Sequence, residues 1–233
     1  MSGTRSQRLF VAVLPPGPAA DELAGAVAPL HRLPGAMDLR WTAREGWHYT
    51  LAFLGNVDEE LLPALYTRLE RAARRTEPFP LRIRGGGRFD GRVLWAGAEG
   101  GLGTLRLLAE RAARRTEPFP LRIRGGGRFD GRVLWAGAEG GLGTLRLLAE
   151  RAAAAARRSG IPMEKHQRHT PHLTLARSRA QADLAPYTAA LEDFDGTPWE
   201  VGEIGLVRSD LPVDGVPGEQ PRYGVVRAWP LGG

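Results

Sequence analysis

The sequence predicts an α+β fold, or at least a mixed-sheet α/β fold, for its 233 residues. Segments with the apolar spacing of strands alternate with segments that have the spacing of amphipathic helices. Several strand pairs are separated only by short turns, which favours this class over a doubly wound parallel sheet. No linker divides the chain, so we expect residues 1–233 to form a single domain.

The first elements follow from the positions of apolar residues. In chain order we expect a strand at 8–14, a helix at 18–31, a short strand at 39–42 and a stronger strand at 47–54. The helix carries Leu23, Val27 and Leu30 on one face. Gly55 and Asn56 follow the last strand and predict a turn there.

Asn56 also predicts the start of the next helix, because Glu59 stands three residues later, as in a capping box. We expect this helix to run from 58 to 75 and to end before Pro78. Its apolar positions recur at spacings of three and four, which predicts a buried face. These positions are Leu61, Leu65, Leu69 and Ala72.

A repeat without a single difference occupies the middle of the chain. Residues 70–113 are repeated at 110–153 with a period of 40, and the tetrapeptide "ERAA" occurs at Glu70, Glu110 and Glu150. Natural solenoid repeats diverge, so perfect identity indicates a recent tandem duplication or an assembly error, with one copy surplus. Removing one unit leaves 193 residues and lowers the net charge from +6 to +2, since the unit 70–109 holds eight arginines and four acidic residues. The basic character therefore says little about partners.

Each copy of the repeat predicts two strands and a helix. The first copy gives a strand at 79–84, a glycine-rich turn at 85–87, a strand at 92–97 and a helix at 102–115. The second gives strands at 119–124 and 132–137 and a helix at 142–158, which Gly160 is expected to end. Two identical units compete for one place in the fold, and the sequence gives no basis for choosing between them. The unit that is not incorporated must extend a sheet or protrude, and we expect it to protrude away from the functional site, because both histidine motifs lie outside the repeat.

The remaining elements complete the alternation. They are a strand at 171–177, a helix near 180–192 and strands near 199–208 and 222–229, the last two joined by a Pro/Gly-rich loop at 211–221.

Two of the strands carry the same histidine motif. "HYTLAF" begins at His48 and "HLTLAR" begins at His172, in a chain with five histidines. Alternate residues of a strand share a face, so His48 lies beside Thr50, and His172 beside Thr174, while the apolar neighbours point the other way. The recurrence between helices suggests two similar lobes that face each other across a cleft.

Two imidazoles and two hydroxyls are suited to phosphodiester hydrolysis. One histidine can deprotonate water and the other can protonate the leaving alkoxide near neutral pH. Threonine hydroxyls can donate hydrogen bonds to the phosphate oxygens as negative charge develops. This division of labour requires no metal ion and no cofactor.

The motif pair resembles the signature of the 2H phosphoesterase superfamily. The opening "RLFVAVLPP", the two histidine motifs and the ending "YGVVRAWPL" together resemble the bacterial RNA 2′,3′-cyclic phosphodiesterases, historically called 2′-5′ RNA ligases. The resemblance follows the chain in order, apart from the additional 40 residues. It implies a bilobal fold of two pseudo-twofold-related antiparallel sheets, flanked by helices around a central cleft.

The resemblance also implies an activity: hydrolysis of the 2′,3′-cyclic phosphate end of an RNA or oligonucleotide to a 2′-phosphomonoester. His48 would donate a proton to the leaving 3′ oxygen, His172 would activate water, and Thr50 and Thr174 would hold the phosphate. Arg177 would bind the substrate, although a regular strand directs it away from His172, so a bend would be needed there. The two motifs alone do not distinguish the acid from the base.

Three other features have simpler explanations. His166, His169 and His172 are spaced like metal ligands on a helix, but Pro171 argues against a helix. "GGGRFDG" at 85–91 lacks the Lys-Ser/Thr ending of a phosphate loop and predicts a hairpin. His31 stands at the expected end of a helix, where we expect it to be a surface residue that interacts with the helix dipole. Aromatic residues could stack on RNA bases, but the sequence does not select among Phe10, Trp41, Trp47 and Tyr49.

Composition limits the remaining possibilities. The chain lacks cysteine and any apolar run long enough to cross a membrane, so we expect a cytoplasmic monomer that does not bind membranes. Within the same chemistry, 2′-5′ ligation or hydrolysis of another cyclic phosphate, such as that of ADP-ribose, is an alternative. An RNA-binding module with an inactive site is the alternative from another class.

Overall fold

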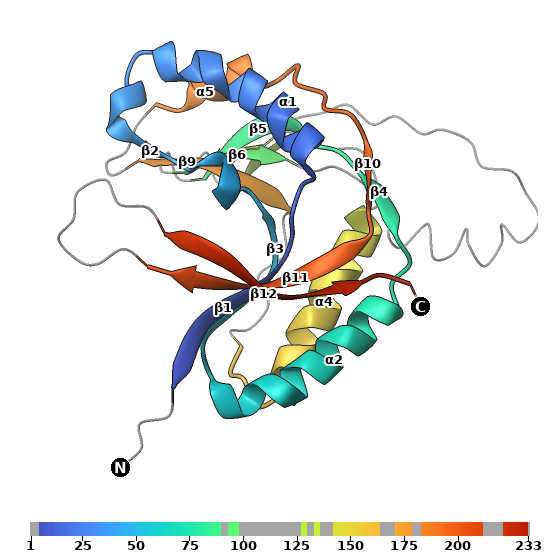
Figure 1. Cartoon of the computed structure of the whole chain (residues 1–233). Helices are drawn as coiled ribbons and strands as arrows, with labels where there is room; N and C mark the ends of the chain where they lie inside the picture. Colours follow the sequence, from blue (N-terminus) through green and yellow to red (C-terminus); the bar gives the residue numbers. More distant parts are fainter. Residues whose placement is uncertain are drawn as a thin grey trace, which may run out of the picture.

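The described part of the computed structural model contains two large antiparallel sheets, each covered by helices, and a two-stranded ribbon (Figure 1). The structure describes residues 5–89, 93–97, 127–129, 133–135, 142–163, 171–178, 183–211 and 221–232. Its strands are β1 (Ser6–Val13), β2 (Leu39–Trp41), β3 (Tyr49–Asp58), β4 (Phe79–Leu81), β5 (Arg84–Phe89), β6 (Val93–Gly97), β7 (Gly127–Phe129), β8 (Val133–Trp135), β9 (His172–Ser178), β10 (Trp199–Val201), β11 (Glu203–Asp210) and β12 (Arg222–Pro230). Its α-helices are α1 (Gly17–Val27), α2 (Leu62–Arg74), α4 (Leu142–Arg158) and α5 (Ala185–Ala190).

The first sheet has the order β12-β11-β1-β3 and is antiparallel throughout. Strand β1 alternates between its two faces, as a strand should. Leu9, Val11 and Val13 point into the main core with residues of α2 and α4. Phe10 and Ala12 point to the other face. One face of this sheet is therefore covered by helices, and the opposite face carries a smaller apolar cluster of Phe10, Ala12 and Val207, against which Tyr223 packs.

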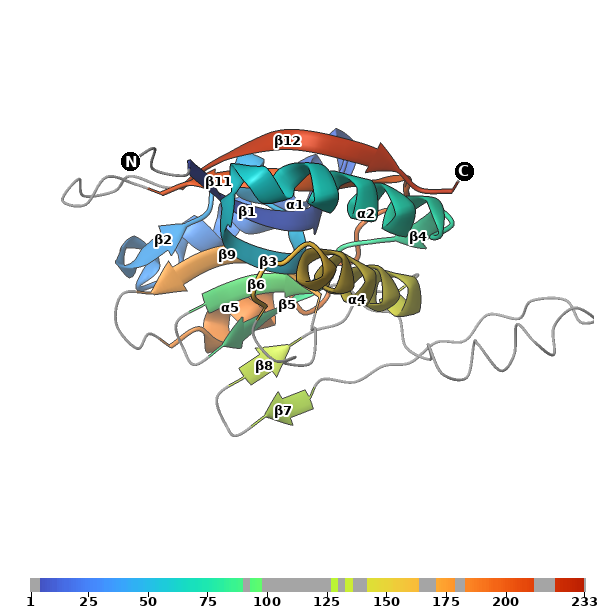
Figure 2. The same cartoon turned by 90° about the horizontal axis from the view of Figure 1, so that it is seen from below.

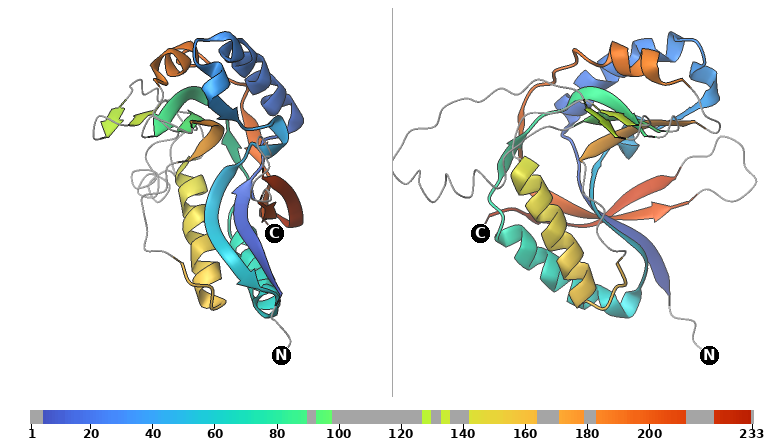
Figure 3. Two further views of the ribbon diagram at one scale, coloured as in Figure 1. Left: turned by 90° about the vertical axis from the view of Figure 1, so that its left-hand side faces the viewer. Right: turned by 180° about the vertical axis from the view of Figure 1, so that it is seen from behind.

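The second sheet has the order β2-β9-β6-β5-β8-β7. Helices α1 and α5 lie together over it, at the opposite end of the molecule from α2 and α4 (Figure 3). A separate ribbon pairs β4 with β10 and runs between the two ends. The predicted arrangement of two antiparallel sheets with flanking helices is confirmed.

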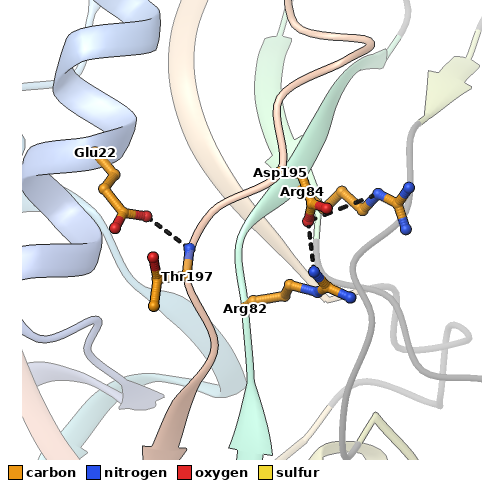
Figure 4. A network of polar contacts seen from close by, with 5 residues as sticks. All are labelled: Glu22, Arg82, Arg84, Asp195 and Thr197. Carbon is orange, nitrogen blue, oxygen red and sulfur yellow. Dashed lines mark hydrogen bonds and ion pairs between the residues drawn. The ribbon is translucent and has the colours of Figure 1, made fainter.

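A set of polar contacts fixes the chain between α5 and β10 against its neighbours (Figure 4). The Glu22 carboxylate of α1 accepts a hydrogen bond from the Thr197 N–H at 2.7 Å. Asp195 forms an ion pair with Arg82 at 2.8 Å and lies 3.9 Å from Arg84. Gly196 N–H donates to the carbonyl of Ile83 at 2.9 Å. This short connection is thus tied both to α1 and to the strand that enters the second sheet.

Each copy of the repeat supplies a different part of the fold. The first copy supplies β5 and β6, with β6 beside β9 in the sheet, and the second supplies α4, which packs against α2 and β3. The second copy's strands β8 and β7 continue the sheet beyond β5, at the end away from β9 (Figure 2). Chain connectivity explains the division: β5 follows α2 and β4 directly, whereas α4 precedes β9 directly. The described strands of the second copy thus extend the sheet and do not protrude as expected, because β8 pairs with the edge that β5 offers. The predicted segments at 102–115 and 119–124 lie outside the described residues.

Two predicted turns are wrong. Gly55 and Asn56 do not end β3, because β1 pairs with β3 as far as Asp58, and Asn56 lies opposite Arg8. Asn56 therefore caps no helix: a 3₁₀ turn at Glu59–Leu61 precedes α2, whose start has no side-chain cap. The glycines of 85–87 do not end a strand either, because they lie within β5: Gly86 and Gly87 pair with β6, and Gly85, with a φ of 61°, is the additional residue of a bulge.

Other boundaries differ in smaller ways. The helix expected at 18–31 is α1 followed by a 3₁₀ turn at Ala28–Arg32, and the helix expected at 180–192 is the shorter α5. The strand expected at 199–208 is two strands, β10 and β11, which belong to different sheets. Helix α4 and strands β1, β2, β9 and β12 are close to their predicted positions, and Gly160 follows α4 with a positive φ of 85°, as a helix stop does.

Candidate active site at the two histidine strands

His48 lies immediately before β3, between two buried aromatic residues. Trp47 and Tyr49 are 5% and 0% exposed and fix the backbone on either side of it. The imidazole turns back on the chain, where Nδ1 donates a hydrogen bond to the carbonyl of Gly46 at 2.8 Å. With the Nδ1 proton held there, the Nε2 atom of the neutral ring carries the free lone pair.

Burial controls the charge of His48. Desolvation disfavours the imidazolium and lowers the pKa of His48 from 6.5 to about 4, although the Gly46 carbonyl opposes this shift. Positive charge on His172 and on Arg177 lowers the pKa further. His48, from the first motif, therefore lies close enough to two residues of the second motif for their charges to act on it.

A β-bulge in the first motif changes which side chains share a face. Thr50 lies opposite Ala12, but Ala52 lies opposite Val11, so Leu51 is an additional residue in β3. This bulge places Phe53 opposite Phe10, and a second bulge at Leu54 follows. Thr50 and Phe53 therefore face the same side as Ala12 and Phe10, although they are three residues apart.

The second motif contains the same irregularity at the same position. In β9, Thr174 lies opposite Trp95 and Ala176 lies opposite Leu94, so Leu175 is the additional residue. Leu175 and Ala176 are both buried, and Arg177 is exposed. The bulge reverses the alternation beyond Thr174 and directs Arg177 to the face of His172 and Thr174. The bend that Arg177 needs is present as this bulge.

The structure thus brings the predicted site residues to one region. Strands β3 and β9 pack against each other where the two sheets meet. Thr50, His172 and Thr174 are each partly exposed there, and Arg177 is exposed. Two imidazoles, two hydroxyls and a guanidinium in one region can bind an anion and exchange protons with it.

Sequence reasoning missed a group of aromatic side chains next to His48. The His48 ring lies 4.5 Å from that of Phe10 and 5.3 Å from that of Tyr223, between ring centroids. Phe53 stacks parallel to Phe10 at 6.3 Å, and the guanidinium of Arg8 lies 4.9 Å from the centre of the Phe53 ring. Phe53 is 51% exposed, so its ring is accessible beside the histidines.

Of the aromatic residues that the sequence named, Phe10 lies at this site. Trp47 and Tyr49 are buried, and Trp41 packs near Tyr187 and the ring of His31. The side chain of Phe53 reaches the site through the bulge at Leu51, which period-two alternation does not predict.

The other candidate sites gain no support. Among the described residues, no three His, Cys, Asp or Glu side chains group as metal ligands would. His166 and His169 lie outside the described part of the chain. Across the described ranges, no helix is long and apolar enough to cross a membrane.

Comparison with known proteins relates this arrangement to one group of folds. The family model "LigT like Phosphoesterase" matches residues 13–95, and the "2'-5' RNA ligase superfamily" model matches residues 104–212. The crystal structure of Escherichia coli LigT in apo form is 23% identical, with a TM-score of 0.60 over 99% of this chain and 100% of LigT. The crystal structure of the protein TT0787 of Thermus thermophilus is 28% identical, with a TM-score of 0.56 over 96% of this chain and 97% of that protein.

Proposed function

The chain belongs to the 2H phosphoesterase superfamily, in its LigT-like family, and on this basis we propose that it hydrolyses the 2′,3′-cyclic phosphate ends of RNA to 2′-phosphomonoesters. E. coli LigT has been crystallised with 3′-AMP and with phosphate, which supports a substrate that contains both a nucleoside and a phosphate group.

The observation that carries the proposal is the matched irregularity of the two motifs. Each motif presents a histidine, a threonine two residues later and a third side chain after a bulge at Leu51 or Leu175. In one motif the third side chain is the phenyl ring of Phe53, and in the other it is the guanidinium of Arg177. An aromatic ring on one side and a cation on the other match the base and the phosphate of a nucleotide.

The proposed reaction divides two proton transfers between the histidines. His172 takes a proton from water as the water oxygen attacks phosphorus, and His48 gives a proton to the 3′ oxygen as the P–O3′ bond breaks. Thr50, Thr174 and Arg177 donate hydrogen bonds to the phosphate oxygens, where negative charge accumulates. Since burial keeps His48 neutral in the free protein, it takes up its proton when the phosphate anion binds and raises its pKa.

The aromatic group next to His48 gives the substrate a place for its base. A base stacked on Phe53 would have the guanidinium of Arg8 on the far side of that ring. Stacking accepts every base, because each has a flat π-face. We therefore expect hydrolysis of cyclic ends with weak preference for the terminal base.

The test is turnover of a short RNA that ends in a 2′,3′-cyclic phosphate, with His48→Ala and His172→Ala as the variants. Removal of a general acid or base lowers the rate by about 10²–10⁴-fold, so each variant should lose that much kcat without loss of fold by circular dichroism. His31→Ala removes an exposed histidine that lies against Trp41 and should retain full activity.

The products decide between the alternatives. A 2′-phosphomonoester supports the proposal, and joined strands with a 2′-5′ linkage would indicate ligation by the reverse reaction. Turnover of ADP-ribose cyclic phosphate but not of RNA would assign a different substrate. RNA binding that persists in both variants, without hydrolysis by the wild type, would favour the RNA-binding module.

A further inference from the structure

Two arginines stand directly opposite each other at the edge of the second sheet. Arg40 in β2 pairs with Arg177 in β9, and both side chains are exposed. Directly paired residues of antiparallel strands point to the same side, with Cα atoms about 4.5–5.5 Å apart. In the part of the chain that the structure describes, neither guanidinium has an ion pair with a carboxylate.

The pair lies on the face that carries the catalytic motif. The flanking residues of β2 are Leu39, which is buried, and Trp41, which packs against the core. Trp41 lies opposite the buried Ala176, so this face of the edge points inward. Arg40 and Arg177 therefore point to the other face, onto which the bulge at Leu175 also brings Arg177 beside Thr174.

Like charges directly opposite each other destabilise a sheet, and this pair lacks a carboxylate among the described residues to offset the repulsion. An anion bound on that face removes the repulsion and accepts hydrogen bonds from both side chains. Since the proposed function already assigns the terminal phosphate to Arg177, a second anionic group of the same substrate fits Arg40.

We propose that Arg40 binds the phosphodiester on the 5′ side of the terminal nucleotide, so that the preferred substrate is an RNA of at least two nucleotides rather than a cyclic mononucleotide. This inference rests on the proposed function. A cyclic phosphate occupies the 3′ end of an RNA, so every other phosphate of the chain lies on its 5′ side. Strand β2 is the outermost strand and lies beyond β9, so Arg40 stands one strand farther out than Arg177. An RNA that leaves the site across β9 passes Arg40.

The experiment compares two substrates in the full-length protein and in Arg40→Ala. One is a nucleoside 2′,3′-cyclic monophosphate, and the other is a dinucleotide with a 2′,3′-cyclic end. A charge-assisted hydrogen bond at an exposed site predicts that Arg40→Ala lowers kcat/KM for the dinucleotide by about tenfold, mainly through KM. The mononucleotide should be hydrolysed at an unchanged rate.

Three controls isolate the charge of the second phosphate. A dinucleotide with an uncharged methylphosphonate linkage should be insensitive to Arg40→Ala, and Arg40→Lys should recover part of the loss. Arg71→Ala removes the same charge from an exposed position on α2, on the other side of the first sheet, and should leave both substrates unaffected. Because the repulsion at β2 is relieved, Arg40→Ala should not lower the midpoint of thermal unfolding.

Each remaining result has a defined meaning. An equal loss for both substrates would overturn the assignment, because Arg40 would then act on the terminal phosphate, and no loss for either would overturn it as well. If the wild type hydrolyses neither substrate, the proposed function fails. The inference is then decided by calorimetry, with a dinucleotide that ends in a 2′-phosphate and a nucleoside 2′-monophosphate as ligands. It fails if Arg40→Ala lowers the affinity for both ligands equally.

Discussion

The imidazole of His48 lies between a backbone carbonyl and two aromatic rings, and these neighbours control its charge. The Gly46 carbonyl holds the Nδ1 proton, while the rings of Phe10 and Tyr223 limit access of water. A charged imidazolium is costly in such surroundings. The imidazole is therefore neutral in the free protein, and an anion bound beside it would raise its pKa and favour uptake of a proton.

This burial predicts a dependence of stability on pH. The pKa of His48 falls from 6.5 in the unfolded chain to about 4 in the folded one, which corresponds to about 3 kcal/mol. Between these values the unfolded chain binds the additional proton, so this contribution is present above pH 6.5 and is lost as the pH falls through 4. In His48→Asn the side-chain amide can donate to the same carbonyl but does not titrate.

The free energy of unfolding, measured with urea from pH 7 to pH 4, should therefore fall less in His48→Asn than in the wild type, by up to about 3 kcal/mol. His31→Asn, at an exposed histidine, should follow the wild type. Parallel curves for the wild type and His48→Asn would show that His48 is not held neutral by the fold.

The spacing of the sequence predicts some site residues and not others. His48, Thr50, His172 and Thr174 follow from period-two alternation, which holds up to each threonine. Phe53, Tyr223 and Arg8 do not follow from it. Phe53 reaches the site through a bulge that no local pattern reveals, and Tyr223 comes from β12, distant in sequence.

At the scale of elements, tertiary pairing overrides the local signals of turns. Glycines and Asn56 have the composition of turns, but β1 and β6 pair with these segments and keep them within strands. Gly85 illustrates the cause, because its N–H donates to the Phe194 carbonyl at 2.8 Å, in a segment over a hundred residues away. Strongly amphipathic helices such as α2 and α4 are predicted well, because their burial depends on their own periodicity.

The connection between α5 and β10 predicts a sensitive glycine. A Cβ atom on Gly196 would lie 3.0 Å from the Ile83 carbonyl oxygen and 3.3 Å from the Glu22 carboxylate. Gly196→Ala should therefore push apart the contacts of Figure 4 and lower the free energy of unfolding by about 1–3 kcal/mol.

Gly202→Ala is the matched control, since no atom lies within 4 Å of the Cβ position at Gly202. Urea denaturation should show a clear loss for the first variant and a change of at most about 0.5 kcal/mol for the second. If both variants lost the same free energy of unfolding, the connection would adjust to the added methyl group and would not fix α1 to the second sheet.

At the scale of the whole molecule, the fold takes its strands from one copy of the repeat and its helix from the other. The sequence reveals the duplication but not this division, because the two copies are identical and differ only in what precedes and follows them. Both histidine motifs lie outside the repeat. Of the second copy's strands, the described ones, β8 and β7, lie at the far edge of the second sheet.

Deletion of residues 98–137 should therefore preserve function. It removes one period and leaves 193 residues, and it retains β5, β6 and α4 with their sequences unchanged. The shortened protein should hydrolyse its substrate with kcat/KM within about twofold of the full chain, because a change remote from the site leaves its groups in place. Steady-state kinetics and size-exclusion chromatography test this, and a large loss of activity would show that β7 and β8 support the site.

The pairing of β5 on its two sides has a consequence for the gene. Arg88 and Phe89 pair with Leu94 and Val93 on one side and with Leu134 and Val133 on the other, so both partners present the same sequence in the same register. Strand β7 repeats the pairing of β5 and ends the sheet with an identical edge. A second round of unequal crossing-over would add another 40 codons, whose strands would meet the same edge. The reading frame can thus lengthen or shorten by whole periods while selection acts on the same two histidine motifs, which leaves the spare copy free to diverge.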